Sequence, residues 1–299
     1  MPRALEVFIS TRPWSFPMTI VCVGFGIAYG FWLTGSIDVP LSLLALLGSV
    51  LLHAAANVWN DYFDYRYGID RPGVGTTVYR PHPIFANIMV PGHVLVFGTS
   101  LGLAALGIGW ALVLAGRPLA LLLGLAGFIL AYSYTGPPLN LKYRGLGELG
   151  VFIAWGPLMV VGGAYVASGS LSLEAAAASV PLGLLVAAVL LANNIRDVEN
   201  DRESGAYTLA VRIGRRSAIK LYQSMILAPY IILVVLYTAK LVPLASLVAL
   251  ASLPLAVSLA RLMSREVPVD ADPRTAKLVV AFGVPYILGT LASAIANAI

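Results

Sequence analysis

Two stretches rich in acids and amides end long apolar runs of the sequence, where charged residues are not expected. The first covers residues 57–64 and the second covers residues 193–201. Positions that recur every three or four residues share one face of a helix. The residues with this spacing are Asn57, Asn60, Asp61 and Asp64 in the first stretch, and Asn193, Asp197 and Asp201 in the second.

Oxygen ligands grouped in this way predict a site for a hard divalent cation. Carboxylates and amides without histidine or cysteine favour Mg²⁺, with Mn²⁺ as the alternative. Asp197 and Asp201 would lie about 6 Å apart along a helix axis, so a positive charge is needed between them. Because Mg²⁺ usually keeps positions open for phosphate oxygens, we expect a phosphorylated substrate, and a diphosphate above all. The alternative, that these acids are solvated or paired with arginines, explains one stretch better than two matched ones.

Cations and aromatic residues nearby are candidates for binding that substrate. Lys142 and Arg144 follow the fourth apolar run and would hold phosphate oxygens. Topology signalling or contact with lipid headgroups explains Arg144 equally well. The full set of substrate-binding candidates is Asn57, Arg71, Arg80, Tyr132, Tyr134, Lys142, Arg144, Asn193 and Asn194, and the catalytic candidates are Asp64, Asp197, Asp201 and Lys142. His53, one turn before Asn57, is expected to line the same cavity.

The elements that must position these residues are membrane-spanning helices. The 299 residues are 59% hydrophobic and only 11% charged, against roughly 25% charged in soluble proteins. The apolar runs have helix length and lack the alternation of barrel strands. The sequence therefore predicts an all-α polytopic membrane protein with a single domain over residues 1–299. The nine expected spans are roughly 15–34, 40–59, 91–115, 117–135, 147–168, 173–194, 218–239, 242–262 and 277–298.

The distribution of charge predicts the orientation. If the N-terminus is cytoplasmic, only Arg117 and Lys240 of the 19 basic residues fall on the outer side. This split predicts a cell-membrane protein with an external C-terminus, and it explains the net charge of +5 without a nucleic-acid partner. Long cytoplasmic loops, 60–90 and 195–217, contain or follow the acidic stretches, and loops of that length are usually functional.

These stretches resemble a known family. Asn-Asp-Tyr-Phe-Asp at 60–64, followed by Asn-Asn-Ile-Arg-Asp-Val-Glu-Asn-Asp at 193–201, resembles the two aspartate-rich motifs of the UbiA superfamily of intramembrane prenyltransferases. Four further segments resemble its menaquinone-pathway branch and the animal relatives of that branch, namely 12–16, 68–70, 134–138 and 208–214.

The resemblance implies nine helices around a central cavity capped by cytoplasmic loops. It implies two Mg²⁺ ions that clamp the diphosphate of a polyprenyl donor. Position by position, Asn60 and Asp64 take the first motif's pair, with Asp61 beside them, and Asp197 and Asp201 take the second motif's pair. Many members carry a third aspartate four residues after Asp64, but this chain has Gly68 there. Either Asp61 or Asp70 would then replace that acid.

The activity implied is prenyl transfer to an aromatic acceptor, with a dihydroxynaphthoate-type quinone precursor expected from the branch. The alternative acceptors are geranylgeranylglyceryl phosphate and 4-hydroxybenzoate. No general base is evident, although Asp70 or Tyr132 would be in range. A cation-coupled transporter is the alternative from another class, but transporters usually hold such groups near the midplane on broken helices.

Overall fold

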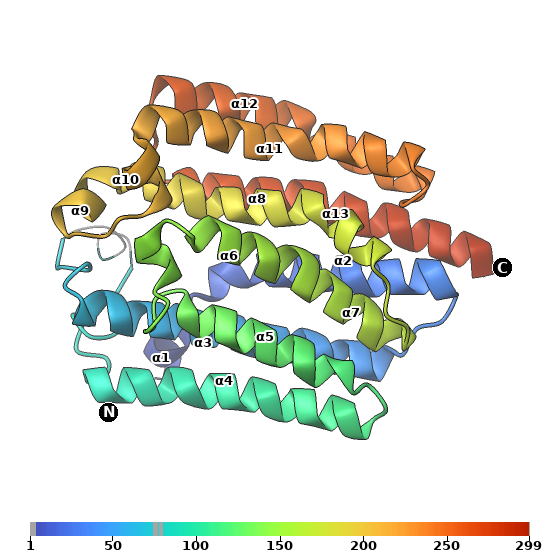
Figure 1. The fold of residues 1–299 in the computed structure, drawn as a ribbon, viewed down its shortest axis with the longest axis horizontal. Helices are drawn as coiled ribbons and strands as arrows, with labels where there is room; N and C mark the ends of the chain where they lie inside the picture. The colour runs from blue at the N-terminus through green and yellow to red at the C-terminus, as the bar shows by residue number, and fades with distance from the viewer. Residues whose placement is uncertain (1–3, 74–76, 78–79, 299) are drawn as a thin grey trace.

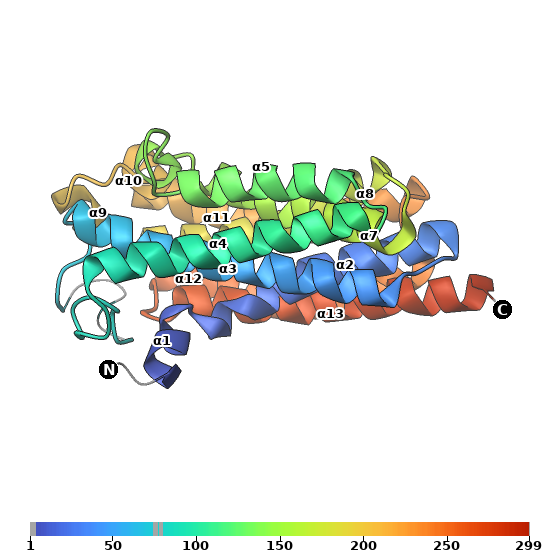
Figure 2. The same cartoon turned by 90° about the horizontal axis from the view of Figure 1, so that it is seen from below.

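The computed structural model describes residues 4–73, 77 and 80–298, and its regular structure there is entirely helical. Over these ranges, eight helices are long and apolar enough to cross a membrane, and the shorter apolar helix α5 runs beside them (Figures 1 and 2). The expectation of an all-α membrane protein with nine spans is thus confirmed in outline.

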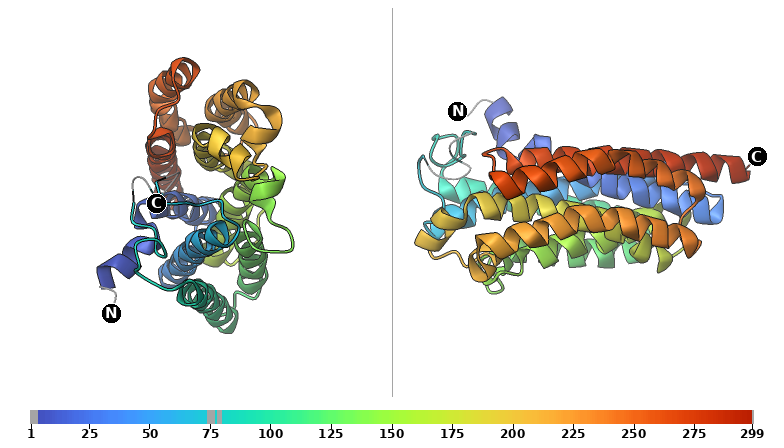
Figure 3. Two further views of the ribbon diagram at one scale, coloured as in Figure 1. Left: turned by 90° about the vertical axis from the view of Figure 1, so that its left-hand side faces the viewer. Right: turned by 90° about the horizontal axis from the view of Figure 1, so that it is seen from above.

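Within the described residues, nine helices or helix pairs make up the bundle. They are α2 (Phe16–Thr34), α3 (Val39–Arg66), α4 (Pro91–Leu114), α5 (Leu119–Ser133), α6 (Gly147–Ile153) continuing through a π-helical segment (Ala154–Leu158) into α7 (Met159–Ser168), α8 (Glu174–Arg196), α11 (Arg215–Thr238), a 3₁₀ segment (Leu244–Ser252) continuing into α12 (Leu253–Arg265), and α13 (Ala271–Ala298). Three short helices, α1 (Ala4–Ser10), α9 (Val198–Glu203) and α10 (Leu209–Ile213), gather at one end, which we call the loop-rich end (Figures 1 and 3). The C-terminus lies at the opposite end.

Helix α3 carries the first acidic stretch. With 28 residues it equals α13 in length, and these two are the longest of the described helices. Helix α3 begins at a side-chain cap, because Asp38 Oδ1 accepts a hydrogen bond from the Leu41 amide at 3.0 Å. It extends seven residues beyond the expected span 40–59 and ends at Arg66. Residues 57–64 therefore form regular helix at the loop-rich end, as their spacing predicts.

Close helix packing fixes one wall of the bundle. A Cβ atom added to Gly26 of α2 would lie 2.3 Å from the Val160 carbonyl oxygen of α7, and one on Gly30 would lie 2.5 Å from that of Ala164. Small residues are the usual means of close packing between membrane helices, because lipid offers no hydrophobic force to hold helices together. The α2–α7 contact is therefore nearly backbone to backbone.

Candidate active site

A cavity of about 800 Å³ opens inside the bundle. Its charged lining is confined to residues of the loop-rich end and consists of five carboxylates and four cations. These are Asp64, Asp70, Asp197, Asp201 and Asp272, with Arg12, Arg80, Lys142 and Lys277. The volume lies in the upper range for small-molecule sites, which span roughly 300–1,000 Å³.

Asp64 is the most heavily bonded of these acids. It is buried, and Lys142 Nζ lies 2.6 Å from its Oδ2, to which Asn60 also donates at 2.8 Å. The Tyr143 hydroxyl donates to the other oxygen. Lys142 and Tyr143 belong to a 3₁₀ turn, Leu141–Arg144, which a hydrogen bond from the Lys142 amide to the Tyr134 carbonyl (2.8 Å) holds beside α3. Burial acts to lower the pKa of Lys142, but the Asp64 carboxylate outweighs it, so that pKa is raised and the ammonium stays charged.

The second acidic stretch contains a helix break that its spacing does not reveal. Helix α8 ends at Arg196, and Asp197 has non-helical angles (φ −93°, ψ 10°) before α9 begins at Val198. Hydrogen bonds from the Asp197 amide to the Asn193 carbonyl (3.0 Å) and from the Asp201 amide to the Asp197 carbonyl (2.8 Å) keep the helical register. Asn193, Asp197 and Asp201 therefore all line the cavity.

The charged side chains around this stretch form ion pairs with one another. Both oxygens of Asp197 accept from Arg196, at 2.8 Å and 2.7 Å, and Arg196 also pairs with Asp272 at the start of α13. Asp201 accepts from the Thr208 hydroxyl at 3.2 Å. Burial raises the pKa of Asp201 to about 7; Lys142 opposes this shift and Asp197 adds to it. For Asp201, burial therefore outweighs the attraction of the Lys142 ammonium.

Asp61 is held apart from the cavity. Its carboxylate is fully buried, pairs with Arg12, and forms a two-point contact with Arg80 at 2.5 Å and 3.1 Å. Arg12 also donates to Asn60 Oδ1 at 3.0 Å, and both arginines line the cavity although Asp61 does not. Asp61 is thus placed to orient two cations that line the cavity.

Asp70 follows the turn that ends α3 and lines the cavity. Gly68 adopts a left-handed conformation (φ +70°) after the end of α3, and the chain then turns back, with the amides of Ile69 and Asp70 bonded to the Asp64 carbonyl (2.9 Å and 3.2 Å). Such a helix end favours glycine over any residue with a Cβ atom. The turn brings Asp70 to the cavity wall. The placement therefore favours Asp70 over Asp61 as the replacement for an acid at position 68.

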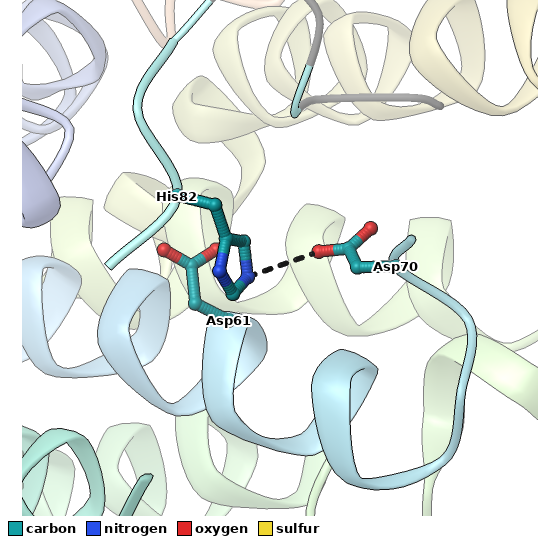
Figure 4. A group of neighbouring side chains, drawn as sticks. All are labelled: Asp61, Asp70 and His82. Atoms are coloured by element: carbon teal, nitrogen blue, oxygen red, sulfur yellow. Dashed lines mark ion pairs between the residues drawn. The ribbon is translucent and has the colours of Figure 1, made fainter. Parts of the chain in front are cut away.

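In one further group of possible ligands, two of the three side chains already have partners of their own. The side chains of Asp61, Asp70 and His82 approach within 4.8 Å of one another (Figure 4). However, His82 Nδ1 accepts from the amides of Ile84 (3.2 Å) and Phe85 (3.4 Å), so Nε2 carries the proton and faces Asp70 at 3.5 Å. With two arginines already on Asp61, this cluster serves to hold the loop that carries His82 against α3.

Most of the candidate residues from the sequence line the cavity, and several lie outside it. The candidates that line the cavity are Asn57, Asn60, Asp64, Arg80, Tyr134, Lys142, Asn193, Asp197 and Asp201, and His53 lines it too. Arg71 and Arg144 are exposed and bond to backbone carbonyls of Gly68 and Pro138, while Tyr132 packs on Trp59 and Phe63. Asn194 points away and donates to the buried Glu148 at 2.9 Å. The sequence reasoning missed Arg12, Tyr143, Asn200, Asp272 and Lys277. Of these, Arg12 lies in the 12–16 segment and Asn200 lies within the second acidic stretch but off its ligand spacing, whereas the other three carry no motif signal.

Comparison with known proteins decides the family. The sequence profile of the UbiA prenyltransferase family matches residues 19–282. The chain belongs to the UbiA prenyltransferase family. UbiA prenyltransferase domain-containing protein 1 of Xenopus tropicalis is 33% identical over 285 residues, covering 94% of this chain and 80% of that protein. The mouse protein of the same name is 33% identical over 295 residues, covering 97% and 84%.

The fold comparison agrees with this assignment. A UbiA homolog from Archaeoglobus fulgidus, solved bound to GPP and Mg²⁺, superposes with a TM-score of 0.69 over 96% of this chain and 99% of that chain. Its sequence is 15% identical, so the likeness shows the shared fold. The expected prenyltransferase class is thereby confirmed, whereas the menaquinone-pathway branch stays a prediction.

Proposed function

We propose that this UbiA prenyltransferase moves a polyprenyl group from a polyprenyl diphosphate to an aromatic acceptor in the membrane, with Mg²⁺ as cofactor. One observation carries the proposal: two acidic motifs far apart in the sequence meet at one polar end of an otherwise apolar cavity. Lys142 Nζ lies 2.6 Å from Asp64 Oδ2 of α3, and Asp64, Lys142 and Asp201 of α9 line the same cavity.

The residues at the polar end fit a hard divalent cation. The donors available are oxygen atoms of Asn60, Asp64, Asp197 and Asp201, with Asp70 in place of the acid absent at Gly68. Asp201 supports this fit, because its carboxylate is buried and forms no ion pair with the residues that the structure describes. Bound Mg²⁺ would supply Lewis-acid stabilisation of the diphosphate leaving group. We propose two ions, one for each motif.

The cations of the site are placed to bind the diphosphate itself. Arg12 and Arg80 line the cavity next to Asn60, and Asp61 fixes both guanidinium groups. Preorganised charges of this kind stabilise a leaving anion without reorganisation at the moment of reaction. Lys142 stays protonated beside Asp64 and adds a third positive charge.

The apolar walls of the cavity would shield the prenyl carbocation from water after the bond between the prenyl carbon and the diphosphate oxygen breaks. Departure of diphosphate leaves an allylic carbocation, which water would quench. Beyond His53 along α3, the cavity is lined by aliphatic side chains and glycines apart from Ser49, so little water can be held near the chain. An electron-rich aromatic carbon would then form a C–C bond to the cation, and the proton lost from that carbon would pass to the released diphosphate or to water at the polar end. A dihydroxynaphthoate-type acceptor is proposed on the resemblance of segments 12–16 and 208–214.

We also propose an orientation of the protein in the membrane, from the distribution of its basic residues. The loop-rich end carries nearly all of the basic residues, so we place it and the N-terminus on the cytoplasmic side of the cell membrane.

Purified protein tests the proposal with labelled polyprenyl diphosphates and a panel of acceptors. The panel contains dihydroxynaphthoate, 4-hydroxybenzoate and geranylgeranylglyceryl phosphate. We expect Mg²⁺-dependent release of diphosphate together with a prenylated naphthoate-derived product. Product formed only from geranylgeranylglyceryl phosphate would overturn the aromatic assignment, and cation transport without diphosphate release would overturn the reaction class.

A further inference from the structure

A second cavity lies at the loop-rich end, between the start of α11 and the end of α12 (Figure 1). Its volume is about 370 Å³, and within the described residues it shares no lining residue with the central cavity. Three arginines line it, namely Arg196, Arg215 and Arg265, together with the acid Glu266. The proposed prenyl transfer assigns no role to these four side chains.

Helices α11 and α12 are basic only at this end. Neither helix contains an acidic residue, and their basic residues lie within the first two turns of α11 and the last two turns of α12. These basic residues are Arg215, Arg216, Lys220, Arg261 and Arg265. Clusters of about four to eight Lys or Arg residues beside the cytoplasmic end of a membrane helix favour anionic lipids. The two helices therefore favour a negatively charged membrane surface at the loop-rich end.

Arg215 and Arg265 retain N–H donors for an anion. Arg265 is exposed and forms no ion pair with any residue that the structure describes. Arg215 Nη2 donates to Glu199 at 2.7 Å, and the same nitrogen donates to the last two carbonyls of α8 at 3.3 Å and 3.4 Å. Because a guanidinium group has five N–H donors, Arg215 can bind a phosphate through Nε and Nη1 while it holds the end of α8.

Acidic residues nearby compensate the three arginines unequally. Arg196 is already paired with Asp197 and Asp272, so it forms a wall of the pocket rather than a spare charge. Glu199 and Glu266 are exposed, and ion pairs between exposed side chains are weak, so a phosphate can displace these acids. The first amides of α11 add partial positive charge, because no side chain caps this helix.

The rest of the pocket is apolar and lies at the ends of two membrane-length helices. Ile219 of α11 and the buried Met263 of α12 line it below the arginines. One turn beyond Ile219, Gln223 donates to the Ala260 carbonyl at 2.9 Å and joins α11 to α12. Both helices belong to segments long and apolar enough to cross a membrane. The pocket therefore lies at the level of the lipid headgroups.

We propose that this pocket binds the phosphate of an anionic lipid headgroup. Arginine forms paired hydrogen bonds with phosphate oxygens, and Arg215 and Arg265 reach the pocket from different helices. A phosphate bound between them joins the ends of α11 and α12, so it stabilises the folded protein. The site is separate from the central cavity, and the inference does not depend on the proposed function.

Thermal melting in an uncharged detergent tests this site, with phosphatidic acid, phosphatidylcholine or inorganic phosphate added to the purified protein. We expect phosphatidic acid to raise the melting temperature, and phosphatidylcholine, whose headgroup has no net charge, to raise it much less. Arg265→Gln should increase the concentration of phosphatidic acid needed for half of the shift by about ten- to a hundredfold, the effect of losing a hydrogen bond to a charged group. Without lipid this variant should melt like wild type, since Arg265 forms no ion pair with the described residues.

Arg261→Gln is the matched control, because Arg261 is an exposed arginine one turn before Arg265 and lies outside the pocket lining. Arg215→Gln and Arg216→Gln form a second matched pair on α11, in which Arg216 is the exposed arginine outside the lining. The two control variants should increase that concentration by at most about fivefold, the effect of one basic residue near an anionic surface.

The proposal is overturned if phosphatidic acid causes no shift, if phosphatidylcholine causes an equal one, or if the pocket and control variants lose the shift equally. Equal losses would mean a diffuse attraction to the whole basic surface. A full shift with inorganic phosphate that requires Arg265 would identify the ligand as a soluble phosphate and overturn the lipid source.

Discussion

Neutralising Asp61 and neutralising Asp70 should have opposite effects: the first should lower the melting temperature, and the second should weaken Mg²⁺ binding. Asp61→Asn keeps the shape of the side chain but leaves two guanidinium groups, one of them buried, without their counter-charge. Removing one partner of a buried ion pair costs about 3–5 kcal/mol. At about 2–4 °C per kcal/mol for large domains, the melting temperature should fall by roughly 6–20 °C.

The matched variant is Asp70→Asn. Asp70 lines the cavity, and its ion-pair distance among the described residues is to His82, 3.5 Å away, whose Nδ1 accepts hydrogen bonds and leaves the ring neutral. We expect this variant to melt close to wild type, because no buried charge loses its partner. We also expect it to bind Mg²⁺ more weakly, since it removes the oxygen ligand proposed to replace an acid at position 68.

Thermal melting in detergent, with and without Mg²⁺ or inorganic pyrophosphate, separates the two roles. A ligand that binds only the folded state raises the melting temperature in proportion to its affinity. Asp61→Asn should keep the shift caused by Mg²⁺ and show a larger shift with pyrophosphate, because Arg12 and Arg80 are no longer neutralised. The reasoning is refuted if Asp61→Asn melts like wild type and loses the Mg²⁺ shift while Asp70→Asn keeps it, since Asp61 would then be the metal ligand.

Four further variants test other parts of the site. Asp64→Asn and Asp197→Asn should each lower prenyl transfer by at least about a hundredfold in a folded protein; normal turnover in both would contradict their assignment as ligands. Tyr143→Phe removes the hydroxyl that donates to Asp64 and should alter the apparent Mg²⁺ affinity by about tenfold, the usual effect of a hydrogen bond to a charged group; an unchanged Mg²⁺ titration would argue against that role. Gly68→Ala should lower stability by about 1 kcal/mol because of its left-handed conformation; a melting temperature equal to that of wild type would mean that the turn is not strained.

Much of the fold follows from patterns within single segments. Long apolar runs specify membrane helices, and the helical spacing of Asn57, Asn60 and Asp64 places them on one wall because α3 continues unbroken to Arg66. The same spacing places Asp61 beside them as well. Its true environment depends on Arg12 and Arg80, which arrive from other segments of the chain, and no local pattern encodes that contact.

Other features of the site depend on tertiary placement in the same way. Asp272 begins α13, yet it meets Asp197 through Arg196, so its role is visible only after α8 and α13 are placed together. Asn194 shares its stretch with Asn193 but lies on the opposite side of α8, where Glu148 occupies it. Sequence spacing thus identifies the face of a helix, whereas the partners on that face come from the packing of distant elements.

The central claim is that the acidic motifs at the polar end of the cavity support metal-dependent cleavage of a prenyl diphosphate. The most direct measurement is release of diphosphate from geranylgeranyl diphosphate by purified protein with an aromatic acceptor, with and without EDTA, for wild type and Asp64→Asn. We predict release in step with prenylated product, abolished by EDTA and by the substitution. Release that neither treatment reduces, or no release with any acceptor in the panel, would contradict the account.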